Sequence, residues 1–264
     1  ARQLLRLPLF WFTAWSLLNQ LKPNLIHCHD FDTLPLGLTW GKLHQVPVIY
    51  DAREYYAELV RPRLKGLSGK GLYWTIQILE PLGARLSSAI ITVDNTLGAI
   101  FRKYNPRVVI IGHYPGRRLA EQATPVFTRA DITLLYAGRL STDRGLLIYA
   151  DLLRLLRRRG IPARLLLAGT FTPASEESAF RAKIHDLEPY VEVAGWIPYD
   201  RIPELLRSAD VGLAILQPIP RYVAALPVKL FEYMAAGLPV IASHFPLIAS
   251  VLENTNAGML VDPT

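Results

Sequence analysis

The sequence predicts an α/β protein with parallel sheets flanked by helices. Short runs of β-branched and apolar residues alternate with helical patterns along nearly all of the 264 residues. Most of these runs are apolar at successive positions, which is typical of parallel strands covered by helices on both faces. A polar stretch near the middle carries two prolines and no clear periodicity, and it separates four runs from the six that follow.

The expected elements follow one another as strand and helix. Strands are predicted at 24–28, 46–51, 88–93, 107–112, 132–138, 163–169, 191–195, 210–216, 238–243 and 258–262. Helices are predicted at 4–23, 69–86, 143–159, 175–187, 201–208 and 228–236. This order gives a first domain over 1–115, a linker over 116–130 and a second domain over 131–264. The second domain has the strand number of a doubly wound sheet. The first lacks opening strands and the chain stops directly after a strand, so we expect a fragment.

Composition limits the class of protein. Hydrophobic residues make up 51% and charged residues 19%, as in a folded globular chain. The net charge of +7 suits anionic partners: nucleotides, nucleic acid or an anionic membrane surface. One cysteine cannot form an internal disulfide, so we expect a reducing cytoplasmic compartment. No secretory signal and no membrane-spanning run is visible. The segment 4–23 is expected to pack on a sheet, with membrane contact through Trp11, Phe12 and Trp15 as the alternative.

The stretch His27-Cys28-His29-Asp30-Phe31-Asp32 contains the residue types of a metal site. Side chains alternate along a strand, so His27 and His29 share one face while Cys28 points to the other. A compact site using all of these ligands would need a bend. We therefore expect no metal here, and expect His29 and Asp30 to line the carboxyl end of the strand or to cap the next helix.

Ligands of open parallel sheets bind outside the carboxyl ends of the strands. Arg139 directly follows the strand predicted at 132–138, and Arg144 lies at the start of the helix after it, an arrangement that suits a pyrophosphate. Gly169 follows the next strand, where a glycine allows the close approach of the backbone to a ligand. The alternative for the two arginines is a solvated loop.

The segment 225–243 opens a helix that carries Lys229 and Glu232. The Glu232 carboxylate could accept hydrogen bonds from a ribose diol, and the backbone at Leu226, Val228 and Lys229 could donate to phosphate. The alternative is a surface glutamate.

In the first domain Asp51, Arg53 and Glu54 crowd the end of a strand, either at a site or as a local ion-pair network. The arginines at 154 and 157–159 are expected to form a solvated helix end, since no aromatic side chains interleave them as in a nucleic-acid surface.

Taken together, these motifs resemble glycosyltransferase family 4, whose members have the GT-B fold. The resemblance extends over nearly the whole chain. The segments that carry it are "LIHCHDFDTLPLG", "VIYDAREYYAE", "AIITVDNTLGAIF", "LLYAGRLSTDRG", "VEVAGWIPYDRIPELLRSADVGLAIL" and "LPVKLFEYMAAGLPVIAS…GMLVDP".

This resemblance implies two Rossmann-like domains and transfer of a sugar, with retention and without metal, from a UDP or GDP sugar to a cell-surface polysaccharide or glycolipid acceptor. The nucleotide sugar is a substrate, and no cofactor is expected. Arg139, Arg144 and Arg53 are the implied catalytic residues. The implied donor-binding residues are Glu232, Lys229, Leu226, Pro227, Val228, Trp196, Ile197 and Gly169, and the acceptor side has His29, Asp30 and Asp51. The expected location is the cytoplasm, with peripheral contact at the inner face of the membrane.

Two positions depart from the family pattern. The first glutamate of the Glu-x7-Glu motif would fall at Ala224, and a histidine of the third-strand motif is Arg53. These departures, with the missing ends, motivate alternatives: a nucleotide-sugar-binding pseudoenzyme, or another GT-B activity such as epimerisation. A nucleic-acid-binding module is the least supported.

Overall fold

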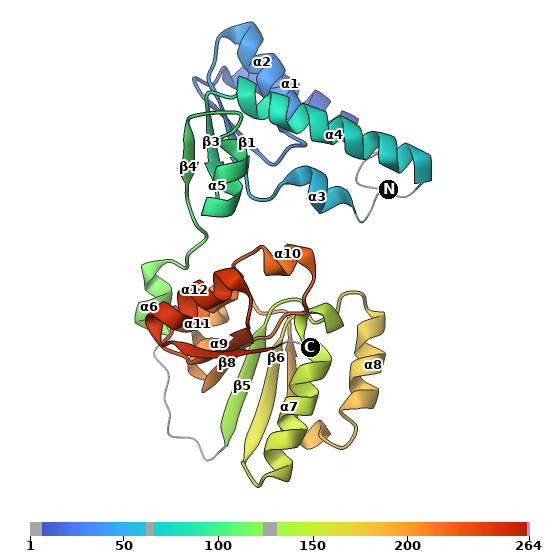
Figure 1. The fold of residues 1–264 in the computed structure, drawn as a ribbon, viewed down its shortest axis with the longest axis vertical. Coiled ribbons are helices and arrows are strands. Elements are labelled where there is room, and N and C mark those ends of the chain that lie inside the picture. Colours follow the sequence, from blue (N-terminus) through green and yellow to red (C-terminus); the bar gives the residue numbers. More distant parts are fainter. Residues whose placement is uncertain (1–6, 62–65, 124–130, 263–264) are drawn as a thin grey trace. The chain divides into compact units, whose positions relative to one another are not determined.

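The computed structural model describes residues 7–61, 66–123 and 131–262, which form two compact units, 1–113 and 114–264. Figure 1 shows the elements of each unit along the chain. The ten predicted strands are all present, each within two residues of its expected start and end. The structure therefore has the predicted α/β class, with two parallel sheets flanked by helices.

The first unit has a four-stranded parallel sheet in the order β1-β2-β3-β4. Its elements are α1 (Leu7–Leu21), β1 (Ile26–His29), α2 (Leu34–His44), β2 (Val48–Ala52), α3 (Tyr56–Val60), α4 (Gly66–Leu86), β3 (Ala89–Thr92), α5 (Asn95–Phe101) and β4 (Val108–Ile110). One face of this sheet is buried under helices through residues such as Cys28 and Tyr50. Burial alternates along β1, so its other face is exposed, which differs from the expectation of strands buried on both faces.

Glu80 of α4 fixes α3 to this sheet. Its carboxylate accepts hydrogen bonds from the hydroxyl of Tyr50 on β2 and from the backbone N–H groups of Tyr56 and Ala57 at the start of α3. Burial raises the pKa of Glu80, which these hydrogen bonds partly counteract. The carboxylate thus satisfies amides of α3 that have no acceptor within that helix.

The second unit has a six-stranded parallel sheet in the order β10-β9-β8-β5-β6-β7. Its elements are α6 (Arg117–Gln122), β5 (Ile132–Ala137), α7 (Leu146–Arg158), β6 (Ala163–Ala168), α8 (Ser175–Lys183), β7 (Val191–Gly195), α9 (Ile202–Arg207), β8 (Val211–Ala214), α10 (Pro220–Val223), α11 (Val228–Ala235), β9 (Val240–Ser243), α12 (Pro246–Thr255) and β10 (Gly258–Val261).

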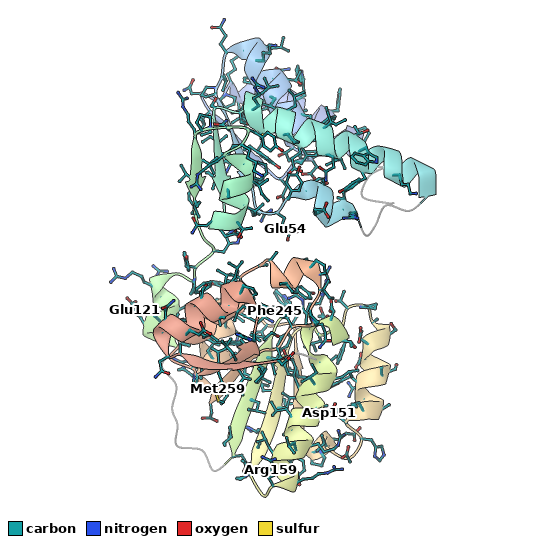
Figure 2. The ribbon with its side chains drawn as sticks, viewed as in Figure 1. Glu54, Glu121, Asp151, Arg159, Phe245 and Met259 are labelled. Carbon is teal, nitrogen blue, oxygen red and sulfur yellow. The ribbon has the colours of Figure 1, made fainter. Side chains whose placement is uncertain are left out.

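Both faces of this second sheet are covered. On one face Tyr136 and Leu167 pack with residues of α7 and α8. On the other, Leu135 and Leu166 pack with α9, α11 and α12, and Phe245, labelled in Figure 2, joins this core where α12 begins. Adjacent strand residues enter opposite cores, as strands buried on both faces require.

The sequence predicted an irregular linker over 116–130, but its described part contains helix α6. Leu119 and Ala123 are buried in the core of the second unit, and α6 contacts α9 and α11. Two apolar positions in a polar stretch, although four residues apart, are too few to establish the period that would indicate this helix. Residues 124–130 lie outside the described part of the chain.

Candidate active site

The second sheet has a topological switch point beside β5. The chain runs from β5 outward to β6 and β7, and then returns to β8 on the other side of β5. Loops that leave β5 and β8 therefore diverge and open a crevice at their carboxyl ends. Arg139 follows β5, and the α10 segment follows β8, so both belong to this crevice edge.

Two glycines form the floor of this edge. Gly138 (φ +143°) and Gly169 (φ +148°) have backbone conformations that side chains rarely adopt. A Cβ on Gly169 would lie 1.7 Å from the carbonyl oxygen of Gly138, and one on Gly138 would lie 2.8 Å from the Lys229 Nζ. The close approach expected at Gly169 is therefore made to a neighbouring loop of the protein itself.

Asp143 is the centre of a charged network in the loop that follows Gly138. Its carboxylate accepts hydrogen bonds from the Ser141 hydroxyl and the Tyr222 hydroxyl (2.8 Å). The guanidiniums of Arg139 and Arg221 also contact it, Arg139 at 3.3 Å. Burial opposes its ionisation, but these hydrogen bonds and charges outweigh burial and lower the pKa of Asp143. Asp143 therefore stays ionised and holds two arginines at the crevice.

Tyr222 joins the two predicted phosphate-binding arginines. Its hydroxyl accepts from Arg139 (3.1 Å) and from the Nε of Arg144 (3.2 Å), and the Arg144 guanidinium lies 5.3 Å from the centre of its ring. The structure thus brings Arg139 and Arg144 together on one aromatic side chain. The Nε of Arg139 is buried without a hydrogen-bond partner.

Lys229 lies beside Gly138 and is only 7% exposed. Its Nζ is 3.5 Å from the centre of the Tyr136 ring and, like the Arg139 Nε, has no hydrogen-bond partner. Burial, and then the positive charge of Arg144, lower the pKa of Lys229 well below its ordinary value. Such an ammonium is costly unless an anion supplies the missing acceptor.

Glu232 lies one turn after Lys229 on α11. Burial raises its pKa, and the neighbouring Lys229 charge opposes that shift. Leu226 and Pro227 lead into α11, which begins at Val228. The first amides of this helix have no acceptor within it, so they remain suited to an anion.

Two further predicted donor residues follow β7. The Trp196 side chain is 71% exposed, and Ile197 is half-buried against the core that includes α9 and α11. Trp196 therefore offers an exposed aromatic face, while Ile197 fixes the backbone beside it.

The predicted residues of the first unit form two contacts at the carboxyl ends of β1 and β2. Arg53 donates to the Asp30 carboxylate at 2.9 Å. From the sequence, the charged residues around Arg53 could form either a binding site or a local ion-pair network, and the structure contains such an ion pair. His29 contacts the Asp51 carboxylate at 2.9 Å, and His27 joins it at 3.2 Å. These residues belong to the first unit and the arginines at 139 and 144 to the second.

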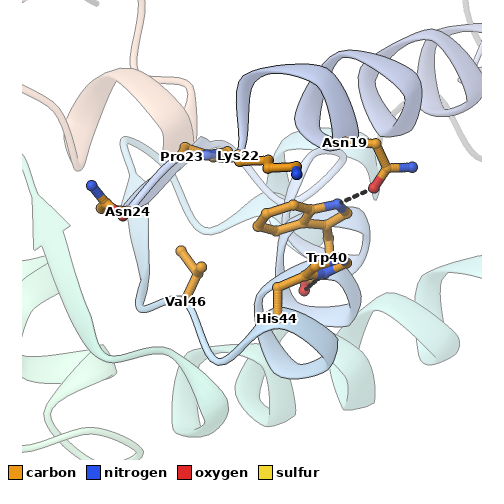
Figure 3. Close-up of a pocket in the computed structure, with 7 residues that line it drawn as sticks. All are labelled: Asn19, Lys22, Pro23, Asn24, Trp40, His44 and Val46. Atoms are coloured by element: carbon orange, nitrogen blue, oxygen red, sulfur yellow. Dashed lines mark hydrogen bonds between the residues drawn. The ribbon is translucent and has the colours of Figure 1, made fainter.

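A cavity of about 480 Å³ lies at the other end of the first sheet (Figure 3). Trp40 forms its wall, with its indole N–H bonded to Asn19 and its ring stacked on His44. Lys22 and Asn24 precede β1 there, so the cavity is at the amino ends of the strands and apart from the predicted site residues.

Sequence reasoning did not identify Asp143, Arg221 and Tyr222 as parts of the site. Asp143 lies between the two predicted arginines. An acidic residue is not expected among side chains that bind phosphate, so the sequence did not indicate its role in positioning them. Arg221 and Tyr222 lie on α10, a four-residue helix whose short sequence has no periodicity to indicate its orientation.

Comparison with known proteins identifies the family. Residues 131–264 match the family described as Glycosyl transferases group 1, and residues 1–113 match Glycosyltransferase Family 4. The amylovoran biosynthesis glycosyltransferase AmsK of Erwinia amylovora is 29% identical over 137 residues, 49% of this chain and 32% of that protein. The GDP-mannose-dependent alpha-(1-6)-phosphatidylinositol dimannoside mannosyltransferase of Mycobacterium tuberculosis is 25% identical over 262 residues, 94% of this chain and 64% of that protein. The chain thus spans about a third to two thirds of the length of these relatives.

Solved structures share the fold at low identity. Anabaena Alr3699/HepE, crystallised with UDP, has a TM-score of 0.69 at 16% identity over 96% of this chain and 68% of its own. Sucrose-phosphate synthase of Thermosynechococcus elongatus has a TM-score of 0.74 at 17% identity over 98% of this chain and 65% of its own. Since one family covers residues 131–264 and the other residues 1–113, the chain belongs to the group 1 (family 4) glycosyltransferases and has the GT-B fold.

Proposed function

We propose that the protein is a retaining, metal-independent glycosyltransferase that uses a UDP or GDP sugar as donor. The acceptor is a saccharide or lipid-linked intermediate of a cell-surface polysaccharide or glycolipid. The donor binds the second unit at the switch point beside β5, and the acceptor binds the first unit at the ends of β1 and β2.

The observation that carries this proposal is a pair of buried cationic nitrogens without hydrogen-bond partners. They are the Nε of Arg139 and the Nζ of Lys229, both at the carboxyl edge of β5. Buried polar groups are nearly always paired, so such atoms indicate a ligand acceptor. A diphosphate supplies several acceptor oxygens and the negative charge that these side chains and Arg144 favour.

The same cations account for transfer without a metal at the diphosphate. As the bond from the sugar to the phosphate breaks, negative charge grows on the leaving diphosphate. Arg139 and Arg144 are held by Tyr222 and so need little rearrangement to stabilise this charge. Asp143 contacts Arg139 directly and is linked to Arg144 through the Tyr222 hydroxyl. It neutralises only part of the positive charge around it, so the diphosphate of the donor supplies the rest.

Glu232 supplies the acceptor for the nucleoside. A half-buried carboxylate on the first turns of α11 suits the two hydroxyls of a ribose, and the exposed Trp196 and the backbone at Ile197 suit the base. The names of relatives support the class of product: amylovoran and colanic acid biosynthesis, and a phosphatidylinositol dimannoside mannosyltransferase.

Nucleotide binding and transfer test this proposal separately. Titration calorimetry with UDP and GDP should show binding that weakens at least tenfold in Arg139→Ala and in Glu232→Ala. Arg181→Ala is the matched control, because it removes an arginine paired only on the surface of α8. Unchanged affinity in both site variants would refute the assignment of these residues to a nucleotide-binding site.

Transfer should then appear in a screen of nucleotide sugars with lipid and saccharide acceptors, should persist in EDTA, and should give a product with the anomeric configuration of the donor. Binding of the nucleotide sugar without hydrolysis or transfer would instead identify a pseudoenzyme, the alternative hypothesis that Ala224 and Arg53 motivated.

We also propose contact with an anionic membrane surface through the outer face of α4. None of the described helices is long and apolar enough to cross a bilayer. However, α4 exposes a row of large apolar side chains at Trp74, Ile78, Leu82 and Leu86, between 48% and 66% exposed. The four-residue spacing places them on one side of the helix.

Charge supports this assignment. Lys70 and Arg85 are exposed on α4, whereas its acidic residue, Glu80, is buried on the inner side. Residues 1–113 hold 13 lysines and arginines against 7 aspartates and glutamates. An apolar row with basic neighbours suits an anionic bilayer.

Vesicle sedimentation tests this contact. The full chain should sediment with phosphatidylglycerol vesicles and far less with phosphatidylcholine vesicles, and Trp74→Ser/Ile78→Ser should abolish sedimentation. Met259→Ser, on β10 and 68% exposed (Figure 2), is the control. Equal sedimentation of the double variant and the parent chain would refute the assignment to α4.

A further inference from the structure

The exposed face of the first sheet brings together three side chains that have the chemistry of a metal site. His27 and His29 are on β1, two residues apart, and so point to the same side. Asp51 on β2 is paired in register with His29, so its side chain rises on that side too. One potential ligand atom of each residue lies within 4.8 Å of the other two.

Both imidazoles point at the same carboxylate oxygen. The Nε2 of His27 lies 3.2 Å, and the Nδ1 of His29 lies 2.9 Å, from the Oδ2 of Asp51. The two rings stack with their centres 4.4 Å apart and their planes 18° apart. Two nitrogens and one oxygen therefore converge on a single point above the sheet.

From this convergence we propose that His27, His29 and Asp51 form a binding site for a borderline divalent cation such as Zn²⁺. A tetrahedral zinc ion with bonds of about 2.0–2.1 Å places neighbouring ligand atoms about 3.3 Å apart. Both observed nitrogen–oxygen separations are close to that value, so an ion can enter with small side-chain rotations. The strand backbone need not bend.

The donor set selects the class of metal. Imidazole nitrogens suit zinc, copper, nickel and iron, whereas magnesium and calcium prefer oxygen. Two imidazoles and one carboxylate leave a coordination position for water or a substrate oxygen. The histidine side chains are 40% and 58% exposed, so that position faces solvent and an ion can reach it.

Two neighbouring residues with metal-binding side chains, Cys28 and Asp30, do not belong to this site. Cys28 is buried on the opposite face, where its Sγ would lie 2.2 Å from a Cβ on Gly37, and burial raises the pKa of its thiol to about 11. Asp30 is occupied by Arg53. This explains why a compact site built only from the 27–32 segment fails, while a ligand from β2 completes one.

The competing structure is a hydrogen-bonded trio, in which each imidazole donates a proton to Asp51. That trio and the metal site use the same atoms, because an ion replaces the two protons. A direct measurement of metal binding separates them without any reference to sugar transfer.

The test uses the untagged full chain, freed of metal by a chelator. Zn²⁺ calorimetry should show one equivalent bound with a Kd on the order of 1–10 µM or tighter, and Co²⁺ should give the visible absorption bands of a nitrogen- and oxygen-ligated ion. His27→Gln, His29→Gln and Asp51→Asn should each weaken binding by at least about tenfold.

His113→Gln is the matched control, since this exposed histidine belongs to the same unit but not to the cluster. Circular dichroism should show all variants folded. Absence of Zn²⁺ binding to the parent chain at 100-fold higher concentrations than expected, or full affinity in both histidine variants, would overturn the proposal and leave the hydrogen-bonded trio.

Discussion

Replacing Lys229 by methionine should weaken donor binding while slightly stabilising the ligand-free protein. Methionine keeps most of the buried stem and its packing against Tyr136, but removes the ammonium. In the structure that ammonium is 3.5 Å from the ring centre and has no hydrogen-bond partner. Ligand affinity and stability should therefore change in opposite directions, which loss of packing alone would not produce.

The magnitudes follow from these contacts. A hydrogen bond to a charged group contributes about 1.5–3 kcal/mol, so the Kd for UDP should rise roughly 10- to 150-fold. An unpaired buried polar group costs about 1–3 kcal/mol, and more when it is charged. The cation–π contact offsets about 2 kcal/mol of this cost. The free energy of unfolding of the variant should therefore exceed that of the parent by about 1 kcal/mol, which corresponds to a rise in Tm of about 2–4 °C for a domain of this size.

The gain in stability should depend on pH. The pKa of Lys229 is lower in the folded protein than its ordinary value of 10.5, so the folded state binds this proton less readily than the unfolded state. The penalty is therefore complete below the folded-state pKa and disappears above 10.5. The Tm difference between variant and parent should shrink as the pH is raised toward that value.

Titration calorimetry with UDP and scanning calorimetry measure the two effects. Lys183→Met is the control, because Lys183 is paired with Asp151 on the surface. Lys229→Met with unchanged UDP affinity, or with a lower Tm at every pH, would refute the assignment of Lys229 as a buried cation awaiting a phosphate.

Three further substitutions test other parts of the structure. Tyr222→Phe removes the hydroxyl that joins four charged side chains and should raise the Kd for UDP about 5- to 10-fold, measured by calorimetry. Unchanged affinity would show that the arginines are positioned without it. Gly169→Ala should destabilise the second unit by more than about 3 kcal/mol in thermal unfolding. The control Gly71→Ala, at a position with open space around it, should stabilise the first unit by about 0.5–1 kcal/mol. Equal effects of the two substitutions would contradict the close backbone approach at Gly169. Glu80→Ala should cost about 3–5 kcal/mol in urea unfolding followed by tryptophan fluorescence, and a cost below about 1 kcal/mol would refute its role in fixing α3.

The sequence predicted the strands because their apolar runs are long and rich in β-branched residues. Helices with a clear apolar stripe were also predicted: α7 buries Leu146, Tyr149, Ala150 and Leu153 at helical spacing. The helices α6 and α10 were not predicted, since their few residues established no clear apolar period, although the equally short α9 was predicted over 201–208. Their ends are set by packing against other elements, which a local pattern does not contain.

The candidate site was predicted in part for a similar reason. Arg139 and Arg144 were identified because loops after parallel strands bind ligands. Tyr222 is 78 residues from Arg144 along the chain, and only the pairing of β8 with β5 brings them together. The contact of His27 with Asp51 likewise depends on the register of β1 and β2, which was not assigned from the sequence.

The two glycines at the proposed donor site have a consequence for engineering. Because the backbone of one loop occupies the space of any side chain at Gly169, this floor offers no position for changing donor preference. The rim differs, since Ala224 ends the short α10 helix and is exposed. Libraries aimed at new donor sugars should therefore vary the α10 loop and keep the glycines fixed, so that substitutions explore specificity without spending folding stability.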